Sequence, residues 1–306
     1  YTIGTGQRGF RDGASDSATF NKPHGMALRD DSLYIADTNN HAIRRIDLSV
    51  GEVTTLAGTG EMGGFQPFIP NTPPLEVDLR SPWALEFGDD EMLYIAMAGT
   101  HQIWQMNLLI DDIRPFVGNG REALINRSLG DSELAQPSGL YFNAGLLYFA
   151  DSESSTIRVA DIPANEVRTV SGVLENSLFD FGDIDGEVGT SRLQHPLGVT
   201  GDGEVIYITD TYNSRIKMIV DDVTTTISGT GEESYMDGDA PEAAYDEPGG
   251  LDYALLDAGR EVLFIADTNN HAIRVLDLAT DTVTTITFPN PEVLQLEDRV
   301  TVIGGA

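Results

Sequence analysis

The chain has 306 residues, and its 49 Asp and Glu against 18 Lys and Arg give a formal net charge of −31 at pH 7. A surface this acidic repels nucleic-acid phosphates and anionic membranes, so neither is expected as a partner. Cysteine is absent, which excludes disulfides, thiolate metal sites and thiol redox chemistry within these residues.

The first elements expected along the chain are four short strands. Residues 25–28 and 33–36 are apolar runs, residues 42–47 mix Ile with charged residues, and residues 53–57 are rich in β-branched side chains. Gly, Asn and Asp fill the gaps, as they do in turns. No stretch shows a long helical period with caps, so the sequence predicts strands without helices.

The same pattern recurs five times along the chain. Each copy has a proline step, an apolar run, a second apolar run that ends in an acid, and an Ile six residues later. The run-ending residues and their Ile partners are Asp37/Ile43, Met97/Ile103, Asp151/Ile157, Asp210/Ile216 and Asp267/Ile273, with Met97 in place of an acid. Successive copies lie 54 to 60 residues apart, which suits a four-stranded propeller blade.

We therefore predict an all-β fold, a β-propeller of four-stranded blades that forms a single domain over residues 1–306. Five full blades are expected at about residues 20–60, 79–120, 134–172, 193–231 and 245–288.

The two ends of the chain predict a partial sixth blade. Residues 1–6 match residues 55–60, the end of a fourth strand, and residues 291–304 hold two more apolar runs. Because propellers protect their edges by closing the ring, we expect both ends to supply closing strands. The alternatives are a closed five-bladed ring and a chain that lacks its first blade. The chain starts at Tyr1, so an upstream segment is expected.

A recurring turn precedes the blades. Eleven residues before the blade prolines stand Asp12, Asp185 and Asp237, each followed by Gly, or else Asn71 and Asn126. This recurrence predicts a structural turn. Asp183, Asp185 and Glu187 also offer the carboxylates that calcium prefers, although the spacing of an EF-hand loop is missing. We expect no cofactor, with calcium as the alternative.

Most other polar candidates repeat and are therefore predicted to be scaffold. His41, His101 and His271 share one register, where the remaining copies carry Ser. Equivalent residues are spread around a ring, so hydrogen bonding within each blade is expected instead of one catalytic cluster. The run-ending Asp is expected to pair with an Arg of the same blade, at position 44, 158, 215 or 274.

Candidate ligand-binding residues stand where the repeat is broken. The residue after each blade proline differs in every copy, and in chain order these residues are His24, Trp83, Ser138, Leu197 and Gly249. The starts of the first strands are where propellers commonly hold ligands, and aromatic side chains supply much of the energy of recognition. We select His24, Trp83, Ser138 and Met97.

The segments Tyr34-Ile-Ala-Asp-Thr-Asn-Asn-His-Ala-Ile-Arg44 and Phe264-Ile-Ala-Asp-Thr-Asn-Asn-His-Ala-Ile-Arg274 resemble NHL repeats. Residues 1–288 resemble the propeller of the NHL-repeat-containing protein 2 family, through variant segments at 94–104, 150–158, 181–186, 193–199 and 247–251. This resemblance implies a propeller that follows a thioredoxin-like domain, with its first blade before the match to Tyr1. It implies protein or ligand binding and no catalytic residue in the propeller.

The function predicted is that of a non-enzymatic binding or scaffold propeller that presents loops and a channel mouth to a protein or small ligand. The alternative, by fold analogy, is a calcium- or zinc-dependent hydrolase or lyase with its site in the central channel. The chain contains no Gly-x-Ser-x-Gly elbow, His-Glu-x-x-His or phosphate loop.

The expected state of the protein is a monomer. No apolar stretch approaches the length of a membrane-spanning helix and no signal peptide is visible, so a soluble protein of unknown compartment is expected. The acid excess with scarce Lys favours a marine or salt-adapted source.

Overall fold

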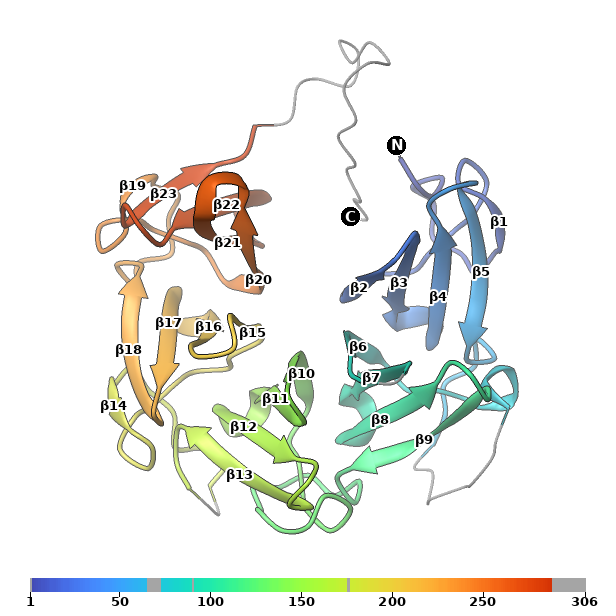
Figure 1. Cartoon of the computed structure of the whole chain (residues 1–306), viewed down its shortest axis with the longest axis horizontal. Coiled ribbons are helices and arrows are strands. Elements are labelled where there is room, and N and C mark those ends of the chain that lie inside the picture. Colours follow the sequence, from blue (N-terminus) through green and yellow to red (C-terminus); the bar gives the residue numbers. More distant parts are fainter. Residues whose placement is uncertain (1, 65–72, 90, 175–176, 288–306) are drawn as a thin grey trace.

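The computed structural model describes residues 2–64, 73–89, 91–174 and 177–287. These residues form a five-bladed β-propeller, in which antiparallel four-stranded blades stand in a ring (Figure 1). The prediction of an all-β propeller is therefore confirmed.

The strands of each blade follow one another from the centre of the ring outward. Blade 1 contains β2 (Met26–Arg29), β3 (Ser32–Asp37), β4 (Ala42–Asp47) and β5 (Glu52–Ala57). Blade 2 contains β6 (Pro82–Phe87), β7 (Met92–Met97), β8 (Gln102–Asn107) and β9 (Asp112–Val117). Blade 3 contains β10 (Pro137–Asn143), β11 (Leu146–Asp151), β12 (Thr156–Asp161) and β13 (Glu166–Ser171). Blade 4 contains β15 (Val199–Gly201), β16 (Ile206–Asp210), β17 (Arg215–Val220) and β18 (Val223–Ser228). Blade 5 contains β20 (Pro248–Leu256), β21 (Arg260–Asp267), β22 (Ala272–Asp277) and β23 (Thr282–Thr285).

Among the described residues, helix is limited to single 3-10 turns. They are η1 (Thr38–Asn40), η2 (Pro74–Glu76), η3 (Ala98–Thr100), η4 (Ser152–Ser154), η5 (Thr211–Asn213) and η6 (Asp257–Gly259). In the described part of the chain, none of these helices is long and apolar enough to cross a membrane.

Three blades gain a two-residue outer strand from the Asp-Gly turns. These strands are β1 (Gly13–Ala14), β14 (Gly186–Glu187) and β19 (Gly238–Asp239), which pair with β5, β18 and β23. In blade 1 the carboxylate of Asp12 accepts hydrogen bonds from the amide and hydroxyl of Thr55, both at 2.9 Å. The turn thus fastens the connection between blades to the outermost strand.

A buried acid and cation organise each of blades 1, 3 and 5. In blade 1, Asp37 accepts hydrogen bonds from the backbone amide of Asn21, from Asn40 Nδ2 and from Arg44 Nη1, each at 2.8 Å. Neither side chain of the Asp37–Arg44 pair is exposed to solvent. One carboxylate therefore joins the blade entry, the turn after β3 and strand β4.

The equivalent pairs repeat this arrangement. Asp151 and Arg158 are 2.8 Å apart in blade 3, and Asp267 and Arg274 are 2.6 Å apart in blade 5. A buried ion pair is tolerated only where further hydrogen bonds satisfy its remaining groups. That condition is met, because Arg158 also donates to the backbone carbonyl of Glu133 at 2.8 Å.

Blade 4 corrects one expected pair. Arg215 does not bind the run-ending Asp210; it binds Asp183, with Nε 2.7 Å from the carboxylate. The partner of Asp210 is Lys217, whose Nζ lies 3.1 Å away. The reason is register, since the cations of blades 1, 3 and 5 all stand seven residues after the acid, and in blade 4 that position is 217.

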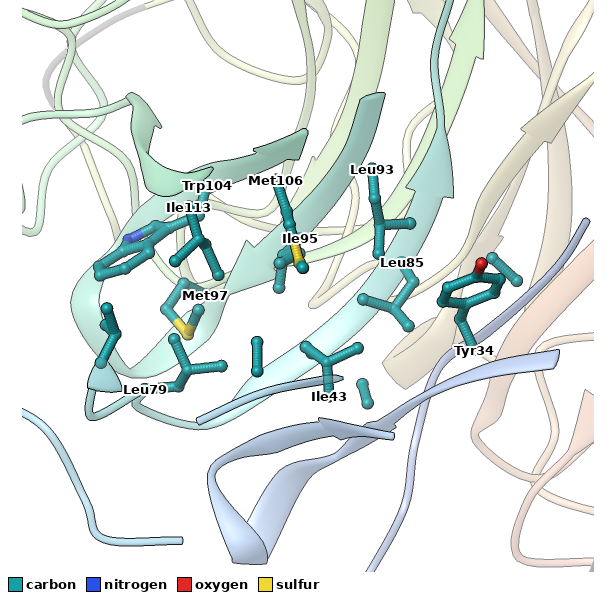
Figure 2. Close-up of a cluster of buried hydrophobic side chains, with 14 residues drawn as sticks. Tyr34, Ile43, Leu79, Leu85, Leu93, Ile95, Met97, Trp104, Met106 and Ile113 are labelled. Atoms are coloured by element: carbon teal, nitrogen blue, oxygen red, sulfur yellow. The ribbon is translucent and has the colours of Figure 1, made fainter. Parts of the chain in front are cut away.

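Blade 2 replaces the ion pair with apolar packing. Met97 and Trp104 occupy the acid and cation positions and are almost fully buried. Figure 2 shows the side chain of Met97 in one cluster with Trp104, Ile113 and Leu79. The backbone amide of Arg80, which would meet a carboxylate in the other blades, donates to Met97 Sδ at 3.4 Å.

The ends of the chain are only partly described. Gly4 and Thr5 donate backbone hydrogen bonds to Ser15 and Ala18, at 2.7 and 3.0 Å, as residues 229 and 230 do at the start of blade 5. Residues 291–304 lie outside the described residues, so the closing strands stay a prediction. Within the described ranges no hydrogen bond joins blade 5 to blade 1.

The Asp151–Arg158 pair gives a stability prediction. Asp151→Ala leaves a buried guanidinium without its carboxylate, so we expect a loss of about 3–5 kcal/mol in the free energy of unfolding. The double variant D151A/R158M removes both charges and should recover most of that loss. Urea unfolding of the three proteins measures both values, and an equal loss in the single and double variants would contradict a role for the pair.

Candidate functional site

Two of the repeated His side chains, those of His41 and His101, join neighbouring blades. His41 Nδ1 accepts a hydrogen bond from the backbone amide of Ser81 at 3.1 Å, and His101 Nδ1 accepts one from Gln136 at 3.3 Å. Ser155 occupies the same register in blade 3, and its Oγ accepts a bond from the amide of His195 at 3.2 Å. These bonds cross between blades, whereas we had expected them within each blade.

A second set of hydrogen bonds crosses the same contacts between neighbouring blades, which we call the joints. The hydroxyl of Thr38 donates to the backbone carbonyl of Pro82 at 2.7 Å, and the hydroxyl of Ser152 donates to that of Pro196 at 2.8 Å. Blade 2 carries Ala98 at this position and has no hydroxyl to donate. The conserved geometry of the repeat therefore uses its polar side chains for holding blades together.

The five residues that follow the blade prolines are called the entry ring: His24, Trp83, Ser138, Leu197 and Gly249. They stand where the innermost strands begin, and these strands approach closely there. The amide of Gly25 donates to the carbonyl of Trp83 at 2.8 Å. A Cβ at Gly25 would lie 2.6 Å from that carbonyl oxygen, so only Gly allows this approach.

The entry ring is uneven, and its aromatic side lies between blades 1 and 2. The rings of His24 and Trp83 have centroids 3.9 Å apart and planes tilted by 36°. Trp83 is half-buried and packs against the core between blades 2 and 3, while His24 is exposed. The residue as a whole is exposed, but desolvation of its ring, which lies against Trp83, lowers the pKa of His24, and the charge of Lys22 lowers it further.

The other two selected residues lie within the scaffold. Ser138 is 2% exposed, and its hydroxyl lies 2.6 Å from Ser152 Oγ and 3.0 Å from the carbonyl oxygen of Leu197. Met97 is fully buried in the core of blade 2 and is not brought to the entry ring. Of the four candidates, the structure brings together only His24 and Trp83.

Sequence reasoning missed Glu86, which lies on the innermost strand β6. Its Oε1 accepts a hydrogen bond from the backbone amide of Phe142 in the next blade at 3.3 Å. Burial raises the pKa of Glu86 to about 8, and the negative charge of Asp252 adds to the shift. A carboxyl group that is protonated at neutral pH can donate a hydrogen bond or a proton.

A signal for Glu86 did exist in the repeat. The fourth residue after each blade proline is Ala27, Glu86, Tyr141, Thr200 or Asp252. This register varies in charge and size, as the entry ring does, and comparing it across the copies would have singled out its two acids.

The candidate calcium ligands are occupied by cations of the chain. Asp183 and Asp185 lie 2.7 and 3.1 Å from Lys217 Nζ, and this ammonium is fully buried. Glu187 is an exposed residue of β14. Lys217 Nζ lies between the carboxylates of Asp183 and Asp185, so a calcium ion bound by both would have to displace this ammonium. Among the residues that the structure describes, no group of three His, Cys, Asp or Glu side chains is placed to hold a metal ion.

Comparisons with known proteins agree with the repeat. The family model of the NHL repeat matches residues 20–46. The chain is 44% identical to Protein SUPPRESSOR OF QUENCHING 1, chloroplastic, from Arabidopsis thaliana, over 90% of the chain and 26% of that protein. It is 36% identical to NHL repeat-containing protein 2 from Gallus gallus, over 99% of the chain and 45% of that protein. The Homo sapiens protein of the same name is 38% identical, over 94% of the chain and 43% of that protein. The chain thus spans less than half of these relatives.

Solved structures show the same fold at low identity. An auxiliary nutrient binding protein from Bacteroides ovatus superposes with a TM-score of 0.63 at 12% identity, over 90% of the chain and 60% of that protein. A structural genomics protein of unknown function from Bacteroides thetaiotaomicron gives a TM-score of 0.62 at 17% identity, over 93% and 62%. Identity this low supports the fold alone.

The joint at His41 predicts a dependence of stability on pH. Burial and the nearby charge of Arg80 lower the pKa of His41 from its ordinary 6.5. The folded protein therefore favours the neutral ring, and its contribution to stability is present above pH 6.5 and is lost as the pH falls through the lowered pKa. His41→Asn keeps an acceptor near the position of Nδ1 and tolerates the left-handed backbone (φ 49°), so its stability should not fall in this window.

The control for the His41 joint uses His271. His41→Leu should cost about 1–3 kcal/mol, because the amide of Ser81 loses its acceptor. His271 has the same backbone conformation (φ 52°), and no hydrogen bond of its ring is recorded within the described ranges. His271→Leu therefore measures the cost of Leu in this conformation, and equal losses in the two variants would disprove the inter-blade role of His41.

Glu86 predicts that stability changes with pH in the direction opposite to that expected for His41. Its folded pKa of about 8 exceeds the ordinary 4.5, so the folded protein binds the proton more tightly than the unfolded chain. This contribution is full below pH 4.5 and is lost as the pH rises toward about 8, with a slope of at most about 1.4 kcal/mol per pH unit. Glu86→Gln keeps the acceptor and removes the charge. The difference in unfolding free energy between E86Q and wild type should therefore grow over this range; a constant difference would refute the shift.

Proposed function

We propose that this chain, which belongs to the NHL-repeat β-propellers, is a non-enzymatic binding or scaffold module that presents its entry ring to a protein or small ligand. One observation carries the proposal. The repeated acids and cations, the rings of His41 and His101, and the hydroxyl groups of Thr38 and Ser152 are bound within the blades or between them. The unrepeated His24–Trp83 pair, in contrast, remains partly accessible at the start of the innermost strands.

The chemistry of the pair favours an apolar or aromatic group as its ligand. Trp83 offers a half-buried aromatic surface, and aromatic side chains in such settings dominate recognition energies. His24 adds a ring nitrogen beside that surface, and it is mostly neutral at pH 7 because its pKa is lowered. A peptide or metabolite with an aromatic ring and one hydrogen-bonding group would match both.

Catalysis remains the competing proposal, and Glu86 is the residue that favours it. A protonated carboxyl in the middle of a ring of innermost strands could act as a general acid. It has no described metal-binding cluster beside it, so any such reaction would depend on Glu86 and its neighbours Tyr141 and Asp252.

The intrinsic fluorescence of the chain tests the binding proposal directly. The chain has two Trp residues, and Trp104 is 2% exposed, so Trp83 supplies the accessible signal. We expect N-acetylated tripeptides with a central Phe to shift this emission saturably, and those with a central Ser to leave it unchanged. His24→Ala should weaken the binding by about tenfold, the loss of one good contact.

The control is Leu109→Ala, an exposed side chain of the turn between β8 and β9. It should leave the binding unchanged. Two results would contradict the proposal: a linear response to every peptide, or turnover of ester or lactone substrates above about 1 s⁻¹, the low end for enzymes, that is abolished by E86Q.

A further inference from the structure

In the segment of residues 177–187, between blades 3 and 4, three partly exposed acids form ion pairs. Asp180 forms a two-pronged ion pair with Arg192, at 2.7 and 3.1 Å. Asp183 binds Arg215 and Lys217, both at 2.7 Å. Asp183 thus ties the segment to blade 4, whereas Asp180 pairs with Arg192 of the same connection.

Its apolar side chains are turned outward. Phe179 is 86% exposed, Phe181 52% and Ile184 53%. Acids and aromatic residues alternate from 179 to 181, so the exposed apolar side chains stand beside carboxylates that are held in ion pairs. We call the three exposed side chains the outer aromatic face.

The backbone beside this face is fixed by hydrogen bonds. The amide of Gly182 donates to the carbonyl of Leu193 at 3.0 Å, and the amide of Ile184 donates to that of Arg192 at 3.1 Å. Asn213 Nδ2 donates to the carbonyl of Gly182 at 2.7 Å. The exposed aromatic residues thus stand on an anchored support and are already arranged for contact, which lowers the entropy that binding would cost.

The other blades show why the aromatic residues are outside here. Two residues before the Asp of the outer turn, blade 1 has Phe10 and blade 5 has Tyr235, and their rings lie over the buried guanidinium groups at 5.0 and 4.8 Å. In blade 4 that position is Asp183, which pairs with Lys217 instead. An acid thus takes the aromatic position of blades 1 and 5 in this blade, and Phe179 and Phe181 stand at other positions, so this packing of the repeat does not account for them.

Charge limits what can cover the outer aromatic face. The side chains of Asp180, Asp183 and Asp185 remain 45%, 35% and 41% exposed around it, and the chain as a whole carries −31. A second copy would bring equal negative charge to the contact, which opposes self-association. A complementary partner has an apolar pocket or ridge with Lys or Arg at its rim.

We propose that the outer aromatic face is a docking site for a protein whose apolar contact surface is bordered by basic residues. This face lies on the perimeter of the propeller and is separate from the entry ring, so the docking proposal does not depend on the proposed function. Phe179 and Phe181 enter the partner's apolar surface, and the neighbouring carboxylates orient the basic rim.

The test uses two synthetic amphipathic helical peptides with the same Leu face, one with Lys and one with Glu at the polar positions. Fluorescence anisotropy at about 0.15 M salt, where long-range attraction is screened, measures their affinity for the intact chain. We expect saturable binding of the Lys peptide and none of the Glu peptide. F179S/F181S should weaken the binding by about tenfold or more, as the loss of a central aromatic anchor does.

The matched control is L109S/I110S, which removes two side chains that are 74% and 68% exposed on the turn between β8 and β9. It should bind the Lys peptide as wild type does, and both variants should keep the wild-type urea midpoint. Equal binding by F179S/F181S and wild type would show attraction by charge alone and overturn the proposal. Failure of the Lys peptide to bind would overturn it as well. So would a wild-type dimer in sedimentation that F179S/F181S abolishes, because the occupant would then be a second copy.

Discussion

The buried ion pair at the end of the second strand is the interaction on which the arrangement of the blades depends. A single Asp accepts a backbone amide from the blade entry, a side chain from the 3-10 turn and a guanidinium from the third strand. The guanidinium in turn reaches the outer turn, because Arg44 Nη2 lies 2.7 Å from Asp12. One network thus holds the inner strand, the outer strand and the connecting turn together. Removing one member leaves a buried charge that has neither a partner nor contact with solvent.

The network also explains why so few polar residues are free for chemistry. A propeller stacks flat sheets around an axis, so each joint between blades must satisfy the turn amides and carbonyls that it buries. In this chain the His and hydroxyl residues at the joints serve that need. The positions that remain for binding a ligand or partner are those outside the joints, namely the entry ring and the outer surface of the connections between blades.

The fold could be predicted from the sequence because each blade repeats the same physical solution. Residues 42–47 were predicted as a strand and are β4. Ile43 and Ile46 lie on opposite faces of this strand, and each is buried in a different apolar cluster. The partner of Asp210 could have been predicted, because Lys217 stands seven residues after the acid, as the paired Arg does in blades 1, 3 and 5. The pairing of Arg215 with Asp183 depends on how the connection between blades lies against β17, which the spacing does not give. Met97 was selected as a ligand-binding candidate because it breaks the repeat, yet its sulfur replaces a carboxylate as the acceptor for a backbone amide.

The candidate site was predicted in part for the same reason. His24 and Trp83 were visible as breaks in a repeat, and their stacking follows from the close approach of β2 and β6 at Gly25. Ser138 also broke the repeat, but it is buried. The groups that cover it, Ser152 and Leu197, come from a turn and from the next blade, so the sequence around Ser138 does not show its burial. Glu86 could not be recognised from its residue type, because the shift of its pKa comes from burial that only the folded ring creates.

The central claim is that the acid–cation pair is a self-contained unit of the blade, and a double-mutant cycle in blade 2 tests it most directly. Met97→Asp and Trp104→Arg would install the pair of the other blades in the apolar core of Figure 2. The claim predicts that each single variant is strongly destabilised and that urea unfolding of M97D/W104R reveals a favourable coupling of about 1–3 kcal/mol. A double variant whose loss equals the sum of the single losses would contradict it.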